Sequence, residues 1–302
     1  MDLKEKILKL KQEKGALILA HNYQLPEIQD VADIVGDSLE LSRAAANRKP
    51  KLIVFCGVIF MAETAKILSP TSKVLIPSLS AGCFLADTVT AEDVKRLRQE
   101  YPDAIFVAYV NTSAEVKAEV DICCTSANAV EVVQRLPEDR PVVFLPDRNL
   151  GNYVQRVSGR SDIILWEKGY CYVHEHIRKE DVLTRKQEYP EAKVIAHPEC
   201  KPEVLELSDV IASTSGMIRY AMESSAKTFI ICTEREMTYR LKKDLPEKEF
   251  IPVSESATCK TMKTVTLERL YRALQDEVYE VNLAEDIIER AKGSIDRMLE
   301  VL

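Results

Sequence analysis

The sequence lacks the features that mark membrane, secreted, nucleotide-binding and nucleic-acid-binding proteins. No apolar run approaches the roughly 20 residues that a membrane-spanning helix needs, and the N-terminal segment MDLKEKILKLKQEKG has no apolar core of a signal peptide. Basic residues number 41 against 48 acidic ones, so the chain lacks the positive charge that binds nucleic acid. The nine glycines form no Walker or dinucleotide-binding fingerprint. We therefore expect a cytoplasmic globular protein that binds neither a membrane nor nucleic acid.

Histidine is also scarce, with four residues, whereas cysteine is common, with eight. In a reducing compartment, cysteines point to metal binding or catalysis rather than to a disulfide framework. Three of them, Cys83, Cys171 and Cys259, follow one another at equal intervals of 88 residues. Such spacing suggests that the three occupy equivalent places in a repeated unit.

Other residues independently set the same period. The segment YPDAIFVAYVN begins at Tyr101, and the similar segment YPEAKVIAHPE begins 88 residues later, at Tyr189. The same interval aligns three further sets of identical residues: Ala20, Ala108 and Ala196; Glu27, Glu115 and Glu203; Asp33, Asp121 and Asp209. The chain therefore contains three copies of an 88-residue unit, and a fourth begins near Cys259 and stops after its first helix.

Each unit alternates strand and helix patterns. In the first unit, short apolar runs at 16–20, 51–55 and 73–77 predict strands, and helical patterns lie between them at 38–47 and 59–68. This alternation predicts an α/β protein with three pseudo-threefold-related, three-layer α/β/α domains built on parallel sheets. We place the domains at 1–85, 86–173 and 174–263. The C-terminal helices in 264–302 are expected to pack back on the first domain.

Polar side chains occupy equivalent positions where strands end. Ligands of open α/β sheets bind beyond the carboxyl ends of the strands. The first strand of each unit is followed by His21, Tyr109 and His197, and two residues further on stand Tyr23, Asn111 and Glu199. A second equivalent set, Ser38, Ser126 and Thr214, precedes or begins a helical pattern. These hydroxyls suit either helix N-caps or an anion site at three helix N-termini.

The three equally spaced cysteines are expected at the same end of the sheets. Zinc would need a fourth ligand, which His174 could supply, whereas a [4Fe–4S] cluster has a threefold axis of its own and would keep one iron without a protein ligand. Cys56 and Cys232 occupy core strands and suit packing. Cys123, Cys124 and Cys200 lack repeat partners. For His174 and His176 we expect a role as a helix cap or as a support for a neighbouring group.

The chain resembles the quinolinate synthase family over essentially its whole length, and seven segments carry the resemblance. The segments are LAHNYQ, GDSL, YVNTSAEVKA, CTSANAV, PDRNLG, HPEC and STSGM. The resemblance implies three α/β domains around a [4Fe–4S] cluster, and a reaction that condenses iminosuccinate (iminoaspartate) with dihydroxyacetone phosphate. Quinolinate, phosphate and water would be the products, for de novo NAD biosynthesis. The resemblance also suggests functional coupling to an aspartate oxidase or dehydrogenase that supplies iminosuccinate.

The resemblance also implies roles for individual residues. Cys83, Cys171 and Cys259 resemble the cluster ligands of the family. The residues that resemble substrate contacts are His21, Ser38, Tyr109, Asn111, Ser126, His197, Glu199 and Thr214. Tyr23 joins Glu199, His21 and His197 as a catalytic candidate. Met262 stands where some members carry a further cysteine, which argues against a local redox switch. Two alternatives share parts of this pattern, namely an aconitase-like hydro-lyase and a non-enzymatic iron–sulfur sensor.

Overall fold

The structure is a computed structural model that describes residues 2–301, and it contains three parallel four-stranded sheets. Their strand orders are β2-β1-β3-β4, β6-β5-β7-β8 and β10-β9-β11-β12, which is one topology repeated three times. The strands are β1 (Ala16–His21), β2 (Ile34–Gly36), β3 (Leu52–Cys56), β4 (Lys73–Leu75), β5 (Ile105–Tyr109), β6 (Ile122–Cys124), β7 (Val142–Leu145), β8 (Ile163–Leu165), β9 (Lys193–Ala196), β10 (Val210–Ile211), β11 (Thr228–Cys232) and β12 (Glu249–Pro252). The predicted fold class is therefore confirmed.

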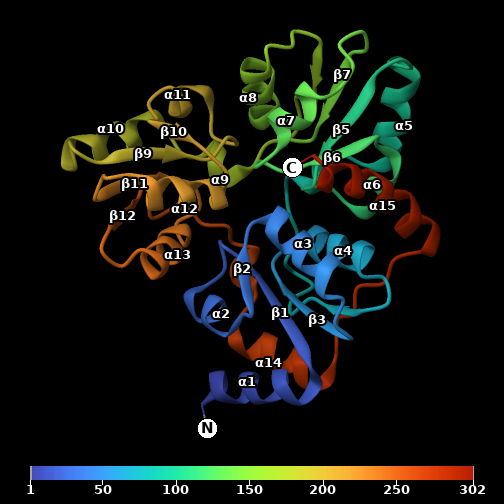
Figure 1. Cartoon of the computed structure of the whole chain (residues 1–302), viewed down its shortest axis with the longest axis vertical. Coiled ribbons are helices and arrows are strands. Elements are labelled where there is room, and N and C mark those ends of the chain that lie inside the picture. The colour runs from blue at the N-terminus through green and yellow to red at the C-terminus, as the bar shows by residue number, and fades with distance from the viewer. Residues whose placement is uncertain (1, 302) are drawn as a thin grey trace.

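Helices cover the sheets and give the molecule three lobes around a common centre (Figure 1). They are α1 (Leu3–Lys14), α2 (Pro26–Val31), α3 (Ser38–Arg48), α4 (Ile59–Leu68), η1 (Ala86–Thr88), α5 (Ala91–Glu100), α6 (Ala114–Glu119), α7 (Ala129–Gln134), α8 (Arg148–Ser158), α9 (Tyr172–Glu175), α10 (Lys179–Glu188), α11 (Pro202–Leu205), α12 (Thr214–Glu223), α13 (Met237–Asp244), η2 (Met262–Thr264), α14 (Leu267–Asp276) and α15 (Glu285–Leu299). The predicted domain edges at 85, 173 and 263 stay predictions. Among residues 2–301 no helix combines the length and apolar character that crossing a membrane requires.

The repeat extends to the helix that opens each unit. Helices α1, α5, α10 and α14 begin at intervals of 88 residues, and the short helices η1 and η2 lie 176 residues apart. Helix α14 is thus the first helix of the incomplete fourth copy, and it packs against α1 and β3 of the first unit.

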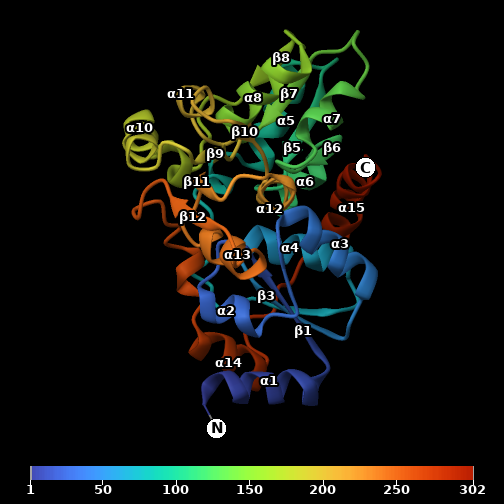
Figure 2. The ribbon, with the colours of Figure 1, turned by 60° about the vertical axis from the view of Figure 1, so that its left-hand side comes forward.

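The last helix departs from the prediction. We expected the C-terminal helix to pack on the first unit, but α15 packs mainly against α6 and β6 of the second unit and touches α4 of the first (Figure 2). Its buried Ser294 donates a hydrogen bond to the carbonyl of Lys117 at 2.8 Å, and Ile295 and Met298 are fully buried. An apolar stripe requires a partner surface but does not specify which one, so the sequence pattern predicted the helix and not its position.

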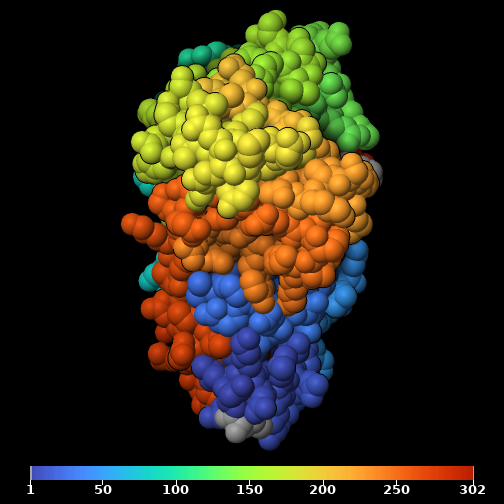
Figure 3. Space-filling view, turned by 90° about the vertical axis from the view of Figure 1, so that its left-hand side faces the viewer, coloured from blue at the N-terminus to red at the C-terminus, as the bar shows by residue number. Residues whose placement is uncertain are grey.

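Two further features lie outside the sequence interpretation. Each sheet contains a short strand of two or three residues, such as β2, which is too short to produce a period-2 pattern. The first and third units also pack directly against each other, and their atoms adjoin across one face of the molecule (Figure 3). The three units therefore surround a common centre and do not form a linear array of separate domains.

An aspartate fixes the short strand to its neighbour in every unit. The carboxylate of Asp33 accepts the backbone N–H of Ile18 at 2.8 Å, and the Asp33 N–H donates to the carbonyl of Ile18 at 2.9 Å. Asp121 with Phe106, and Asp209 with Val194, repeat both bonds with donor–acceptor distances of 2.8–3.0 Å. The aligned aspartates of the repeat thus hold β2, β6 and β10 in register.

We predict that Asp33→Ala lowers the free energy of unfolding by about 1–3 kcal/mol, because the buried N–H of Ile18 loses a charged acceptor. Asp103→Ala is the matched control, since Asp103 is exposed at a helix–strand turn and should change stability by less than about 0.5 kcal/mol. Urea titration of both variants measures the difference. Equal midpoints for the two would show that the aspartate bond contributes nothing to the fold.

Candidate active site

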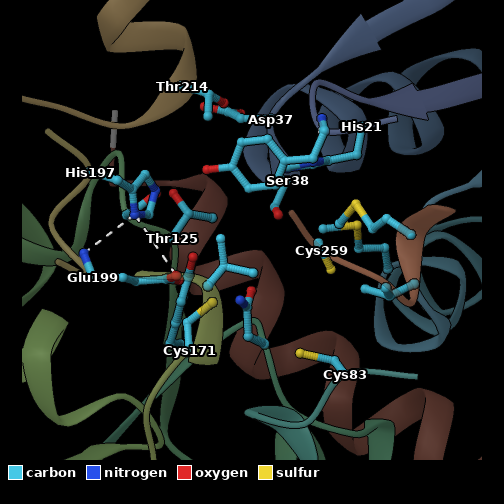
Figure 4. Close-up of a pocket in the computed structure, with 18 of the residues that line it drawn as sticks. His21, Asp37, Ser38, Cys83, Thr125, Cys171, His197, Glu199, Thr214 and Cys259 are labelled. Atoms are coloured by element: carbon cyan, nitrogen blue, oxygen red, sulfur yellow. Dashed lines mark hydrogen bonds and ion pairs between the residues drawn. The ribbon is translucent and has the colours of Figure 1, made fainter. Parts of the chain in front are cut away.

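A pocket of about 640 Å³ lies where the three units meet. All twelve residues proposed from the sequence line it: His21, Tyr23, Ser38, Cys83, Tyr109, Asn111, Ser126, Cys171, His197, Glu199, Thr214 and Cys259. Figure 4 shows their side chains converging from different units, with the cysteines grouped on one side of the pocket and Thr214 on the other. The equivalence of these positions in the repeat therefore corresponds to proximity in space.

The two histidines at strand ends have the same geometry. His21 ends β1, and His197 directly follows β9. In each case the backbone N–H two residues further on donates to Nδ1, from Tyr23 to His21 at 3.2 Å and from Glu199 to His197 at 3.3 Å. Because Nδ1 accepts a bond, the proton of each neutral ring is on Nε2. The Nε2 of His197 lies 3.2 Å from the hydroxyl oxygen of Ser126, in the second unit.

Two hydrogen bonds and one ion-pair contact connect Tyr23 with Glu199. The Tyr23 hydroxyl lies 2.5 Å from Oγ1 of Thr233, and the same Oγ1 lies 2.7 Å from Nε2 of His174. The other ring nitrogen of His174, Nδ1, is 2.7 Å from Oε2 of Glu199. The Tyr109 hydroxyl also bonds to Glu199. A proton on any of these groups thus has a bonded path to the others.

The pocket hydroxyls are not the helix caps that one interpretation of the sequence suggested. Asp37 caps α3 by accepting the N–H groups of Leu39 and Glu40, and Ser213 caps α12 by accepting that of Gly216. Each cap stands one residue before its pocket residue, Ser38 or Thr214. In the second unit Thr125 occupies the same repeat position before Ser126. The hydroxyls of the three pocket residues are therefore available to the cavity.

Side chains from the first and third units hold this wall of the pocket together. The amide of Asn22 donates to Oγ1 of Thr214 at 2.8 Å, and the Ser215 hydroxyl donates to the carboxylate of Asp37 at 2.5 Å. All four side chains are buried. Because the Thr214 oxygen accepts from Asn22, its own proton is free to point toward a ligand.

Burial sets the protonation states of the pocket groups. It lowers the pKa of His21 to about 4 and that of His197 to about 3, with nearby carboxylates opposing the shift, so both rings are neutral at pH 7. Burial, and then the charge of Glu199, raise the pKa of Tyr23 and of Tyr109 well above the usual tyrosine range. For Glu199, burial opposes ionisation, but His174 and His197 together with hydrogen bonds from His174 and Tyr109 lower its pKa. Glu199 is therefore ionised beside two neutral tyrosines.

The three cysteines differ from the other five. Cys83 precedes η1, Cys171 directly precedes α9, and Cys259 precedes η2, and all three are half-buried against the pocket. Burial raises the pKa of the Cys83 thiol to about 12 and also raises that of Cys171, and the charges of Cys259 and Glu199 add to both shifts. The remaining five, Cys56, Cys123, Cys124, Cys200 and Cys232, are fully buried and do not line the pocket.

His174 belongs to a group that resembles a metal site. Ligand atoms of Cys171, His174 and Glu199 lie within 4.8 Å of one another. Nε2 of His174 is hydrogen-bonded to Thr233, however, and Nδ1 faces the carboxylate of Glu199 at ion-pair distance. These contacts indicate that His174 connects the two side chains and does not serve as a zinc ligand.

Four residues of the site were missed or left without a defined place by the sequence analysis. Asp37 and Thr125 could have been found by moving one residue back along the repeat from Ser38 and Ser126. Thr233 follows β11, so the strand-end rule applied to the third strand of the unit would have found it. His174 gave no positional signal, because its neighbour in space, Glu199, lies in another segment.

Known proteins resemble the chain over nearly its whole length. Residues 5–300 match the family described as "Quinolinate synthetase A protein". The "Quinolinate synthase" of Caldicellulosiruptor bescii is 51% identical over 299 residues, which cover 99% of this chain and 98% of that protein. The "Quinolinate synthase" of Pyrococcus horikoshii is 50% identical over 301 residues, covering 100% and 99%.

A solved structure was also matched. It is the E-1-hydroxy-2-methyl-but-2-enyl-4-diphosphate reductase from Plasmodium falciparum, with 10% identity and a TM-score of 0.31 over 86% of this chain and 92% of that one. At that TM-score the likeness carries no argument about this protein.

We predict that His21 and His197 remain neutral in the folded protein down to about pH 5, because burial lowers their pKa values. Their unfolded rings, with a pKa near 6.5, bind protons below that pH, so the stability that they contribute is present above pH 6.5 and falls as the pH drops. Imidazole ¹⁵N shifts of the metal-free protein measure this, with His21→Asn and His197→Asn assigning the signals. Titration of either ring near pH 6.5 would show that water reaches it.

Proposed function

The chain belongs to the quinolinate synthase family, and on that premise we propose that its central pocket condenses iminosuccinate with dihydroxyacetone phosphate at a [4Fe–4S] cluster held by Cys83, Cys171 and Cys259. Its activity is quinolinate synthesis in the de novo biosynthesis of NAD. The observation that supports the proposed site is the convergence of three thiols, one from each repeated unit, on the same pocket as the acid–base groups.

The residues present fit a cluster. Three half-buried thiols face one cavity, and backbone N–H groups already point at two of the sulfurs, those of Ala86 and Leu85 at Cys83 and that of His174 at Cys171. Hydrogen bonds of this kind stabilise cluster thiolates. The apolar side chain of Met262 also lines the pocket. A cluster bound through three cysteines would supply an iron with an open position, which can act as a Lewis acid.

We propose that neutral donors bind the anionic groups of the substrates. Ser38 and Thr214 begin α3 and α12, where the positive end of the helix dipole favours carboxylate and phosphate oxygens. The Nε2 protons of His21 and His197 and the side chains of Tyr109, Asn111 and Ser126 complete the set of donors. Neutral donors suit this role, since they bind anions without requiring buried cations.

We propose that Glu199 removes protons and that Tyr23 delivers them. Ring closure and loss of two waters require several proton transfers, and Glu199 is the ionised base in the pocket. The bonded path through His174 and Thr233 connects it to the Tyr23 hydroxyl. A proton taken up by Glu199 can return at the tyrosine through this path. His21 and His197 are the further acid–base candidates.

The supply of substrate and the location complete the proposal. Iminosuccinate must come from oxidation of aspartate, so we propose functional coupling to an aspartate oxidase or dehydrogenase in the cytoplasm. Family membership argues against the two alternatives from the sequence, an aconitase-like hydro-lyase and an iron–sulfur sensor. A sensor would also have no need for the bonded groups between Tyr23 and Glu199.

The ligand assignment predicts the effect of each cysteine on iron content. Cys83→Ser, Cys171→Ser and Cys259→Ser should each abolish the [4Fe–4S] absorption of anaerobically reconstituted protein, because one iron loses its thiolate. Cys56→Ala is the control, since this thiol is fully buried in β3 and its loss should cost only roughly 1–3 kcal/mol of stability. Iron and sulfide analysis measures the outcome. Full iron content in any of the three serine variants would remove that cysteine from the ligand set.

The proton-transfer roles predict large losses of turnover without loss of iron. Anaerobic incubation of the protein with both substrates should yield pyridine-2,3-dicarboxylate, and Glu199→Gln or Tyr23→Phe should lower kcat by about 10²–10⁴. Glu206→Gln, an exposed carboxylate after α11, should leave kcat within a factor of about two. Chromatographic quantification of the product measures the rates. Wild-type turnover in Glu199→Gln would contradict its role as base.

A further inference from the structure

A buried ion pair joins the loop that carries Cys259 to the loop that carries Tyr23. Glu234 follows β11 and is 0% exposed. Its Oε1 accepts the backbone N–H of Cys259 at 3.2 Å and lies 2.8 Å from Nζ of Lys263. Its other oxygen accepts the N–H of Glu236 at 2.8 Å. The carboxylate therefore fixes the backbone of a proposed ligand cysteine.

The lysine extends this connection into the first unit. Lys263 lies in η2, four residues after Cys259, and its Nζ also donates a hydrogen bond to the backbone carbonyl of Tyr23. Its side chain is 16% exposed. The N–H of the same tyrosine bonds to Nδ1 of His21, so the residue is held on both sides. One ammonium group thus contacts both the carboxylate that holds Cys259 and the main chain of Tyr23.

The other units show that this connection is not part of the repeat. In the second unit Asp147 is 1% exposed and accepts the N–H of Cys171 at 3.0 Å, but its other oxygen caps α8 through Leu150 at 2.8 Å. In the first unit Val58 occupies the corresponding place at the end of the third strand, and valine has no acceptor side chain. Carboxylates hold two of the cysteines, and of these two supports only that of Cys259 adds a lysine.

We propose that Lys263 is a positioning residue that couples the Cys259 loop to Tyr23, so that retention of the cluster and the placement of the tyrosine hydroxyl depend on the same ion pair. This inference rests on the proposed function. A buried pair is costly to break, because the remaining charge is left without its partner. Loss of the lysine should therefore disturb both loops, whereas a residue that stabilised only the fold would not link them.

Lys263→Met tests the coupling, because it removes the charge and keeps an apolar stem. In the anaerobic holoenzyme we expect loss of iron to a chelator to accelerate by about 10-fold and kcat to fall by about 10-fold, with little change in KM. Lys260→Met is the matched control, since Lys260 lies in the same loop with an exposed side chain. It should match the wild type in both measurements.

A double-variant cycle with Tyr23→Phe separates positioning from general destabilisation. If Lys263 acts on turnover through Tyr23, adding Lys263→Met to Tyr23→Phe should lower kcat by less than about twofold further. Iron loss should still accelerate in the double variant. Asp147→Asn provides the contrast, because it should accelerate iron loss while its effect on kcat multiplies with that of Tyr23→Phe.

The outcomes divide clearly. Faster iron loss and lower kcat together, with the kcat effects non-multiplicative, support the coupling. A change in only one measurement, no difference from Lys260→Met, or fully multiplicative kcat effects would overturn it. If Lys263→Met does not fold, Glu234→Gln and Lys263→Arg replace it, with smaller changes expected in the same direction. A wild-type protein that assembles no cluster would instead refute the proposed function.

Discussion

The geometry of parallel β-sheets is the constraint on which the site depends. All strands of a parallel sheet end at the same edge. Residues that follow β1 and β3 therefore meet above the first sheet, those that follow β5 and β7 above the second, and those that follow β9 and β11 above the third. The three sheets turn these edges toward a common centre. A residue placed just after a strand therefore reaches the pocket from any unit, without long loops to carry it there.

The repeated backbone supports a site that is not symmetric. The same position carries His21, Tyr109 and His197, and the next equivalent position carries Tyr23, Asn111 and Glu199. Burial disfavours charge on the ionisable groups among them, but for Glu199 the effects of His174, His197 and Tyr109 outweigh burial and lower the pKa. Symmetry of the scaffold thus brings the groups together, and the difference in side chains and their partners separates base from acid.

The cysteines follow the opposite pattern, with identical side chains in unequal surroundings. Cys171 and Cys259 have backbone N–H groups held by buried carboxylates, whereas Val58 stands at the corresponding place near Cys83. Lys263 adds a connection from the Cys259 support to the backbone of Tyr23, and the support of Cys171 has no corresponding lysine. A threefold ligand set is therefore built on supports that differ from unit to unit, and this difference can link metal binding to the placement of one side chain.

The sequence by itself determined the repeat, the fold class and the twelve proposed site residues, because an 88-residue period makes equivalence in the chain visible without coordinates. It also predicted the helices at 38–47 and 59–68, which correspond to α3 and α4. The tertiary structure decided which surfaces meet: α15 on the second unit, Thr233 and His174 between Tyr23 and Glu199, and Glu234 under Cys259. These contacts join segments far apart in the chain, and no local pattern encodes them, since a buried side chain takes whichever partner packing brings within reach.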